Sequence, residues 1–284
     1  MNLPRPAQTP LAKPRPWHPG PFLLAQLALH VAALVWFLIS PHEWRWAAAI
    51  VLLSQLVLMA ASLWPRSTCL GANLVRLPTA AVQRAEVAIT IDDGPDPQVT
   101  PQVLAILAQQ GAKATFFCIG ERAAAHPELC RSILAQGHPI ENHGARHPTL
   151  CALSGPAGWR REIEDGQHIL QRITGQTPHF YRAVAGLRNP FLDPVLHGLG
   201  LQLATWTRRG FDTRERDPEK VLRRLSHQLA AGDILLLHDG NAARTPSGEA
   251  LIVAVLPRLL DAIRAHGLTP VTLAHACIPI ESES

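Results

Sequence analysis

The 284-residue sequence predicts an α/β domain built on a parallel sheet and preceded by a two-helix transmembrane hairpin. Three observations predict this arrangement. Two long apolar stretches lie within the first 64 residues. From residue 86 onward, short β-branched segments alternate with segments that carry helix start and stop signals. Two of the β-branched segments end on Asp or His side chains, and strand ends are where α/β folds carry their chemistry.

The two stretches near the N-terminus are long enough to cross a lipid bilayer. Residues 22–39 carry no formal charge, and residues 44–64 carry only Arg45 at their edge. At about 1.5 Å per helical residue, each stretch approaches the roughly 30 Å thickness of the hydrocarbon layer. A cleaved signal peptide would explain only the first stretch, so we expect a helical hairpin. Tryptophans, which favour bilayer interfaces, lie at or near the ends of the stretches: Trp17, Trp36, Trp44, Trp46 and Trp64.

Three polar residues, Gln26, His30 and Gln55, interrupt the apolar stretches. Polar side chains in membrane helices often form hydrogen bonds between helices, and we expect these three to do so. A role in binding or function is the alternative.

Basic residues flank the hairpin on both sides, whereas only Arg45 lies near its turn. Because positive charge marks the cytoplasmic side, both ends of the chain are predicted to face the cytoplasm. The sequence therefore predicts a two-pass protein of the inner (cytoplasmic) membrane with its main domain in the cytoplasm, and a periplasmic domain is the alternative. Contact with anionic membrane lipids is also expected. The flanking basic residues are Arg5, Lys13, Arg15, Arg66, Arg76 and Arg84.

Composition divides the chain into five segments. The segment between the hairpin and the main domain contains proline and glycine, and we expect it to be a linker that tethers the main domain near the bilayer. The predicted segments are a proline-rich basic segment at 1–21, the hairpin at 22–64, the linker at 65–85, the main domain at 86–276 and a tail at 277–284.

Strand and helix signals alternate along the main domain. Helix starts are predicted where Thr100 and Asp217 precede a proline, and helix ends at Gly111 and Gly267. This alternation predicts a parallel sheet covered by helices. The predicted strands are Val87–Ile91, Ala114–Ile119, Gln202–Trp206, Ile234–Leu237 and Pro270–Leu273.

The first predicted strand runs into two adjacent aspartates, Asp92 and Asp93, followed by Gly94 and Pro95. Two like charges side by side repel each other, so a strand that ends on them usually has a cation to hold. A solvated turn is the alternative, because Asp, Gly and Pro all favour turns.

Two histidines, His143 and His147, lie four positions apart about fifty residues further on. On one helical turn they would share a face. Ordinary surface histidines are the alternative interpretation. Combined with a carboxylate, however, two imidazoles suit zinc or another divalent transition metal and leave positions open for water and substrate.

The order of these motifs resembles that of the polysaccharide deacetylases, the carbohydrate esterases related to nodulation-type chitooligosaccharide deacetylases. The first family motif corresponds to Thr90–Pro95, the second to His143–His147 and the last to Leu236–His238. The phrase Ala114–Phe117 is also typical of these enzymes. The resemblance extends over residues 86 to 275 and implies a distorted (β/α)7-type barrel.

The resemblance, with the chemistry of amide hydrolysis, implies a metal centre and a base. Asp93, His143 and His147 would hold a divalent metal ion, with zinc expected and cobalt, nickel or iron as alternatives. Asp92 would take a proton from the attacking water, and Arg182 beside it would keep that carboxylate ionised and oriented.

The resemblance also implies an acid. His238 would protonate the departing amine, and Asp212 would orient His238 through its second ring nitrogen. The backbone amide of Ala185 would assist at the acyl oxygen. A buried core histidine is the alternative for His238 taken alone.

Two family motifs are altered in this chain. The third motif keeps Arg182 and Gly186 at the family separation but lacks both prolines between them. In the fourth, Asp212 precedes Thr213 where a tryptophan is usual, and Trp206 lies six positions upstream. This change implies that one aromatic wall of the usual substrate groove is missing.

The sequence thus predicts a metal-dependent hydrolase that removes an N-acyl group, expected to be acetyl, from an amino sugar. A membrane-proximal glycan or a polyprenyl-linked saccharide is the expected substrate. A periplasm-facing peptidoglycan or exopolysaccharide deacetylase is one alternative, and a catalytically silent glycan-binding membrane protein is another. The net charge of +4 without a basic run gives no indication of nucleic-acid binding, and five cysteines without a Cys-x-x-Cys motif indicate no disulfide framework.

Overall fold

The computed structural model describes residues 16–278. The basic residues Arg5, Lys13 and Arg15, which enter the topology prediction, lie outside the described residues, as does most of the predicted tail. The predictions that concern them stay predictions.

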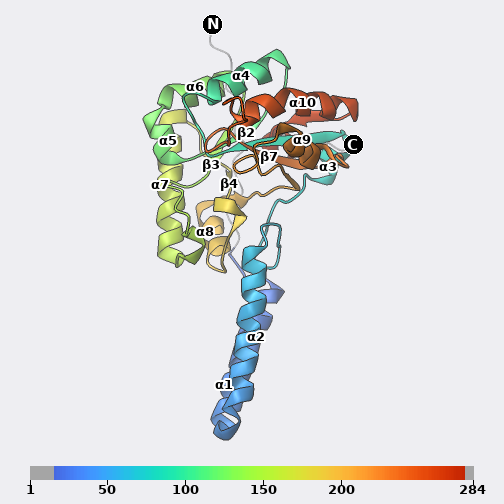
Figure 1. Cartoon of the computed structure of the whole chain (residues 1–284). Coiled ribbons are helices and arrows are strands. Elements are labelled where there is room, and N and C mark those ends of the chain that lie inside the picture. The colour runs from blue at the N-terminus through green and yellow to red at the C-terminus, as the bar shows by residue number, and fades with distance from the viewer. Residues whose placement is uncertain (1–15, 279–284) are drawn as a thin grey trace, which may run out of the picture.

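The predicted hairpin is present as two helices that project together from the main domain (Figure 1). α1 spans Pro21–Ile39 and α2 spans Trp44–Leu63, joined by the 3-10 turn η1 at Pro41–Glu43. Both are long and apolar enough to cross a membrane, and only 11% and 17% of the two segments is buried in the structure. A core helix of a soluble domain would be mostly buried.

The polar residues of the hairpin bond across it, as predicted. Gln55 Nε2 lies 2.9 Å from His30 Nε2, and Ser54 donates a hydrogen bond to Gln26. Small residues such as Ala33 and Ala47 are buried between the helices, which lets the two backbones approach closely.

The segment expected to be a tether packs against the main domain. Leu70 is fully buried, and Leu74 forms a parallel bridge with Ala204. The short helix α3 (Thr79–Gln83) buries Ala81. The end of α2 is therefore connected to the domain by a packed segment, because Leu74, Leu77 and Ala81 pack with side chains of the sheet in one hydrophobic cluster.

All strand pairs of the sheet are parallel, as the βα alternation predicts. The strand order is β5-β4-β3-β2-β1-β7-β6, with β8 pairing beside β1. The order ends at β5 on one side and β6 on the other, so the sheet is a half-barrel open at one side, a distorted form of the (β/α)7 barrel. The strands are β1 (Glu86–Asp92), β2 (Thr115–Cys118), β3 (Ile140–Asn142), β4 (Phe180–Tyr181), β5 (Gln202–Leu203), β6 (Arg208–Arg209), β7 (Ile234–His238) and β8 (Thr269–Val271).

Helices connect the successive strands, except β5 and β6, and cover the outside of the half-barrel (Figure 1). The helix after Asp217 begins as predicted, because the Asp217 carboxylate accepts a hydrogen bond from the Glu219 amide at 2.9 Å. Thr100 is instead the first residue of its helix, and its hydroxyl donates to Asp239 at 2.5 Å. The helices are α4 (Thr100–Gln109), α5 (Gly120–Ala125), α6 (Pro127–Ala135), α7 (Pro156–Thr174), α8 (Leu192–Leu199), α9 (Pro218–Ser226), α10 (Leu251–Ala265) and α11 (Leu273–Ala276), with 3-10 turns η2 (Cys151–Leu153) and η3 (Val184–Gly186).

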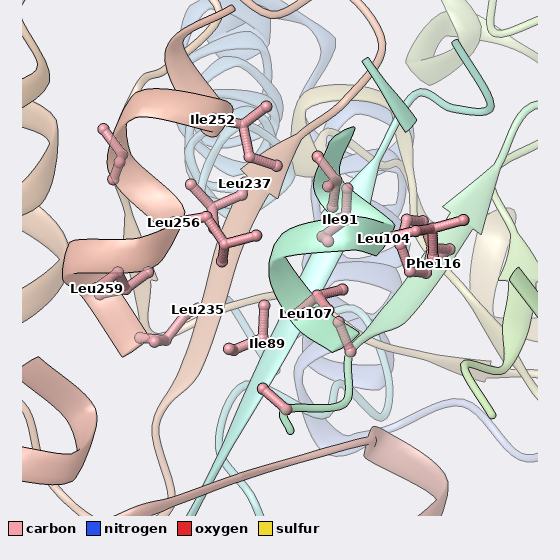
Figure 2. Close-up of a cluster of buried hydrophobic side chains, with 14 of the residues drawn as sticks. Ile89, Ile91, Leu104, Leu107, Phe116, Leu235, Leu237, Ile252, Leu256 and Leu259 are labelled. Atoms are coloured by element: carbon pink, nitrogen blue, oxygen red, sulfur yellow. The ribbon is translucent and has the colours of Figure 1, made fainter. Parts of the chain in front are cut away.

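Side chains along the central strands point alternately into the hydrophobic core and into the interior of the half-barrel. Ile89 and Ile91 of β1, with Leu235 and Leu237 of β7, pack against α4 and α10 in the main hydrophobic cluster (Figure 2). Successive side chains of a strand point to opposite faces, so the residues between and after these point into the half-barrel. Asp92 is one such residue.

Three strands were not predicted: β3, β4 and β6. Each has only two or three residues, and β6 consists of two arginines, so none shows the β-branched alternation from which strands are predicted. The strand predicted at Gln202–Trp206 is also shorter than expected, ending at Leu203. Pairing with parallel neighbours defines these short strands rather than local propensity.

Candidate active site

Asp92 and Arg182 form a buried ion pair inside the half-barrel. Arg182 is fully buried, and its Nη1 donates to Asp92 Oδ1 at 2.7 Å and to Thr90 Oγ1 at 2.8 Å. Its other nitrogens donate to the carbonyl oxygens of Ala204 and Thr205. Arg182 therefore has no rotational freedom, and it holds one carboxylate oxygen of Asp92 while leaving Oδ2 toward the pocket.

Asp93 points to a different place from Asp92 because the backbone reverses at this residue. Its φ is +72°, in the left-handed region that non-glycine residues rarely adopt. Its Oδ1 lies 3.1 Å from His143 Nε2 and 3.2 Å from His147 Nε2. Asp93 is held in this conformation by Arg122, which donates to its carbonyl oxygen at 2.8 Å, and by Asn241, which donates to Oδ2 at 3.0 Å.

The two histidines meet on a loop after β3, not on a helical turn as the spacing suggested. His147 has a φ of +59° and Gly144 a φ of +85°, so the loop folds back and brings the ring centroids of His143 and His147 to 4.7 Å. Glu162 of α7 stabilises the loop, because its Oε1 accepts the amide hydrogens of Arg146 and His147, each at 2.8 Å. The predicted proximity is present, but its cause is this loop.

The chemistry of this three-residue group fits a divalent metal ion. One ligand atom from each of Asp93, His143 and His147 can be chosen so that all three lie within 4.8 Å of one another. His143 Nδ1 lies 2.8 Å from the Arg182 carbonyl oxygen, so the ring donates there and is held with Nε2 toward Asp93, where a metal ion would take the place of the Nε2 proton. Ligand atoms at about 2.1 Å from one ion in tetrahedral geometry would be about 3.4 Å apart, close to the distances observed.

Asp93 and His143 shift each other's pKa values, because each stabilises the charged form of the other. Burial alone would raise the pKa of Asp93, but hydrogen bonds from His143 and His147 hold it far below its usual value. Burial alone would lower the pKa of His143, but the charges of Asp92 and Asp93 raise it above its usual value. The imidazoles and the carboxylate therefore stabilise one another, and a divalent ion that displaced the imidazole protons would meet three ligands already brought together.

His238 and Asp212 form a second buried pair. Asp212 is fully buried, and its Oδ1 lies 2.8 Å from His238 Nδ1 while its Oδ2 accepts the His238 amide at 2.7 Å. Burial lowers the pKa of His238, but the charge and hydrogen bond of Asp212 outweigh it and raise this pKa to about 9. With Nδ1 bonded to Asp212, the other ring nitrogen, Nε2, is left without this partner, and His238 lines the pocket.

One pocket of about 200 Å³ is lined by Asp92, Asp93, His143, His147 and His238, together with Ala185, Leu236 and Thr213. Ala185 has a φ of +53° in η3, so the third motif turns tightly without its prolines. Thr213 lines the pocket at the position where a tryptophan is usual in the family. Trp206, six positions upstream of Asp212, also lines the pocket, so an aromatic side chain is present there.

Sequence reasoning did not identify Asn241, Arg122, Glu162 and Arg209 in or around this pocket. Asn241 also accepts a hydrogen bond from Arg122 at 2.8 Å, so one connected set supports Asp93. The only sequence signal is for Asn241, which follows the last family motif by three positions. The other three act from separate helices and strands, and no local pattern marks them.

Comparison with known proteins identifies the family to which the chain is similar. A family model described as polysaccharide deacetylase matches residues 79–204. A peptidoglycan-N-acetylglucosamine deacetylase of Bacillus cereus is 33% identical over 190 residues, covering 66% of this chain and 86% of that protein. A chitooligosaccharide deacetylase of Sinorhizobium fredii is 31% identical over 196 residues, covering 67% and 91%.

Solved structures give the same relationship. A crystal structure of a peptidoglycan N-acetylglucosamine deacetylase matches with a TM-score of 0.64 at 29% identity, covering 72% of this chain and 92% of the other. A family 4 carbohydrate esterase from Streptomyces lividans, solved with acetate, matches with a TM-score of 0.59 at 30% identity, covering 66% and 91%. With this fold and these sequence matches, the chain belongs to the polysaccharide deacetylase family, enzymes that hydrolyse the amide bond of N-acetylated amino sugars.

Proposed function

We propose that this protein is a membrane-anchored, metal-dependent deacetylase of an amino sugar in a membrane-proximal glycan or lipid-linked saccharide. The observation that carries the proposal is the convergence of Asp93, His143 and His147 on one point, beside the paired residues Asp92 and His238. A base and an acid next to a cation site meet the requirements of amide hydrolysis, since the carbonyl must be polarised and the amine protonated.

In this proposal Asp93, His143 and His147 hold the ion, with zinc expected and cobalt, nickel or iron as alternatives. When bound, the ion would polarise the acyl carbonyl and lower the pKa of a water molecule in the pocket. Asp92 accepts a proton from the attacking water through the oxygen that Arg182 leaves free.

His238 completes the reaction by donating its Nε2 proton to the departing amine nitrogen. Asp212 is a positioning residue, because it accepts from Nδ1 and so directs Nε2 into the pocket. The result is an amine on the sugar and a carboxylic acid, expected to be acetic acid. The Ala185 amide would stabilise the acyl oxygen, a role that its place in the pocket lining supports.

The anchoring hairpin supports a substrate at the membrane. α1 and α2 are candidate spans, and the segment after α2 packs onto the domain that carries the site. We propose that the domain faces the cytoplasm, on the charge bias of the sequence. The names of the relatives, peptidoglycan and chitooligosaccharide deacetylases, favour the second candidate, a periplasm-facing deacetylase of envelope glycan.

The test is release of acetate by the purified full chain in detergent after reconstitution with zinc, cobalt, nickel or iron. Substrates would be a polyprenyl-linked N-acetylglucosamine, a chitooligosaccharide and a peptidoglycan fragment. Release from the lipid-linked sugar is expected to be fastest. Bound metal without acetate release from any substrate would contradict the proposal and favour a silent glycan-binding protein.

Topology is tested separately by a reporter fused after Ser284. A reporter active only in the cytoplasm is the expected result. Activity only in the periplasm would overturn the proposed orientation and favour the envelope-glycan candidate.

A further inference from the structure

A basic and aromatic groove of about 560 Å³ lies beside the active-site pocket, between the end of α2 and β6. Trp64 and Arg66 line it from the side of the hairpin, and Arg209 and Phe211 line it from the domain. Trp206 and Arg209 line both this groove and the active-site pocket. The two spaces therefore adjoin at these two side chains.

Arg209 is a cation with no carboxylate partner among the described residues. Its Nε atom is buried and makes no hydrogen bond within that part of the chain. Aromatic rings support the guanidinium instead, with its central carbon 5.2 Å from the Trp206 ring centroid and 5.1 Å from that of Phe211. Burial lowers the pKa of Arg209, and the charges of Asp92 and Asp212 oppose that effect.

The neighbouring arginines differ from Arg209 in this respect. Arg208 pairs with Asp233, and Arg224 pairs with Glu215 at 3.3 Å. Arg209 is half-buried, and a guanidinium with a buried Nε and no anion beside it is costly unless something compensates its charge. The guanidinium of Arg209 is stacked on two rings, and its N–H donors are unused within the described part of the chain. It can therefore bind an anion that lies in the plane of the guanidinium.

Arg66 supplies a second cation at the end of the hairpin. Its Nη1 donates to the Thr207 carbonyl oxygen at 3.2 Å, which ties the first turn after α2 to the strand that carries Arg209. The contact between hairpin and site is close, because a Cβ atom on Gly186 would lie 2.5 Å from Pro65 and 2.8 Å from Trp206. Trp64, 61% exposed, marks the level at which α2 would leave the bilayer.

We propose that this groove binds the phosphate ester of a lipid-linked amino sugar, with Arg66 and Arg209 as its phosphate ligands. The inference rests on the proposed function, and it names the anionic part of that substrate. In a 2-acylamino sugar 1-phosphate, the phosphate and the acyl group are on adjacent carbons. A phosphate site must therefore adjoin the catalytic pocket, as this groove does through Arg209 and Trp206.

The position also fits the lipid. A chain attached to the phosphate would leave the groove beside Trp64, where the apolar surface of α2 ends. The sugar would point the other way, past Trp206 and toward the metal ligands. Aromatic faces commonly border such amphipathic ligands because one end is apolar and the other is wet.

The test compares two substrates in detergent that differ only in the phosphate: dodecyl phosphate-linked N-acetylglucosamine and dodecyl N-acetylglucosaminide. The measured quantity is the preference, the ratio of kcat/KM for the first to that for the second, with the full, metal-loaded chain. We expect a preference above tenfold, reduced about tenfold in Arg209→Gln and in Arg66→Gln. Arg161→Gln, which changes an exposed arginine on α7, is the matched control and should keep the preference.

A binding measurement separates this inference from the proposed function. Tryptophan fluorescence would report the Kd of dodecyl phosphate, which has no sugar to hydrolyse. Weaker binding in both groove variants supports the site even if no acetate is released from any substrate. Acetate release with a preference of one, or with a preference that both variants retain, overturns the site while leaving the deacetylase intact. A third outcome is that dodecyl phosphate binds through the two arginines but the kcat/KM ratio of the two substrates is one. The groove would then be a binding site for phospholipid headgroups, and the proposal would be wrong.

Discussion

Asp92 and His238 are direct partners in the parallel register of β1 and β7. Their side chains therefore emerge on the same face of the sheet, one from each of two strands separated by about 4.8 Å. Backbone hydrogen bonds of the ladder fix the spacing of these two groups. Asp93, one residue further, needs a reversed backbone to reach a different point, and this is why two adjacent aspartates can have different roles.

The first prediction concerns Asp92. Asp92→Asn should lower kcat about 10²- to 10⁴-fold, because an amide cannot accept the proton from water. The bound metal should stay, since Asp92 is not one of the three converging ligands. Acetate release and metal content by mass spectrometry are measured together, with Asp165→Asn on the exposed face of α7 as the control. Full activity in Asp92→Asn would show that another group is the base.

The second prediction concerns Glu162, which reaches the metal ligands only through the backbone. Glu162→Ala removes the acceptor for the amides of Arg146 and His147, so the loop should lose its fixed shape. We expect metal affinity to fall about 10- to 100-fold, and activity to return at higher metal concentration. Removal of the metal by a chelator should abolish activity in both proteins.

The readout is a metal titration of chelated protein, followed by activity. Glu164→Ala, two residues along the same helix, is the matched control and should titrate like the parent chain. An unchanged metal affinity in Glu162→Ala would mean that the loop holds its conformation without this side chain.

Much of the site was predictable because the family motifs name residue types in order. Asp92, Asp93, His143, His147 and His238 all line the pocket. These residues converge because the strands of a parallel sheet all end at the same edge. Motifs that follow successive strands therefore lie close together there. The central strands were equally predictable, since β1 and β7 are long apolar runs.

The errors came from features with no local signal. The His143 and His147 pair looked helical by its spacing, but two residues with positive φ shape it into a loop. Trp206 lies six positions before Asp212, and no local pattern marks it as a lining residue of the pocket. Arg209 belongs to a two-residue strand that only pairing with β7 defines. Long-range contacts decide all three, and sequence periodicity does not report them.

The third prediction uses a buried histidine outside the site. His138 is 1% exposed, and its Nδ1 accepts the Ala114 amide at 3.2 Å. Burial, with the charge of Lys113, lowers its pKa to about 4. A histidine in the unfolded chain has a pKa near 6.5. The unfolded chain therefore binds a proton at His138 more tightly than the folded protein does. Stability that is present above pH 6.5 is therefore lost as the pH falls toward 4.

The measurement is thermal unfolding of the detergent-solubilised chain at pH 7 and at pH 4.5. We expect the acid loss in the parent to exceed that in His138→Gln by about 1–2 kcal/mol, or roughly 2–8 °C in Tm. His168→Gln, an exposed histidine on α7, is the control and should follow the parent. Equal acid losses in His138→Gln and the parent would rule out His138 as the sensor.

The last prediction separates the two functions of Asp212. In the parent chain, Asp212 raises the pKa of His238 to about 9 against the effect of burial, so the imidazole stays protonated through neutral pH. An acid catalyst loses activity as the pH rises through its pKa. Asp212→Asn should lower the pKa of His238, and the alkaline limb of the kcat/KM profile should move to lower pH by one unit or more. At pH 8 the variant should lose about ten times more activity than at pH 6.

A structural role alone would not produce that shift. If Asp212 only held β7 in place, Asp212→Asn would lower kcat equally at every pH and would lower the Tm. Asp261→Asn, on the exposed face of α10, controls for a general change in charge and should keep the parent profile. An alkaline limb that stays where it is in Asp212→Asn would mean that the limb belongs to another group. His238 would then remain next to the pocket without supplying the proton, and the acid would have to be sought among the other residues that line it.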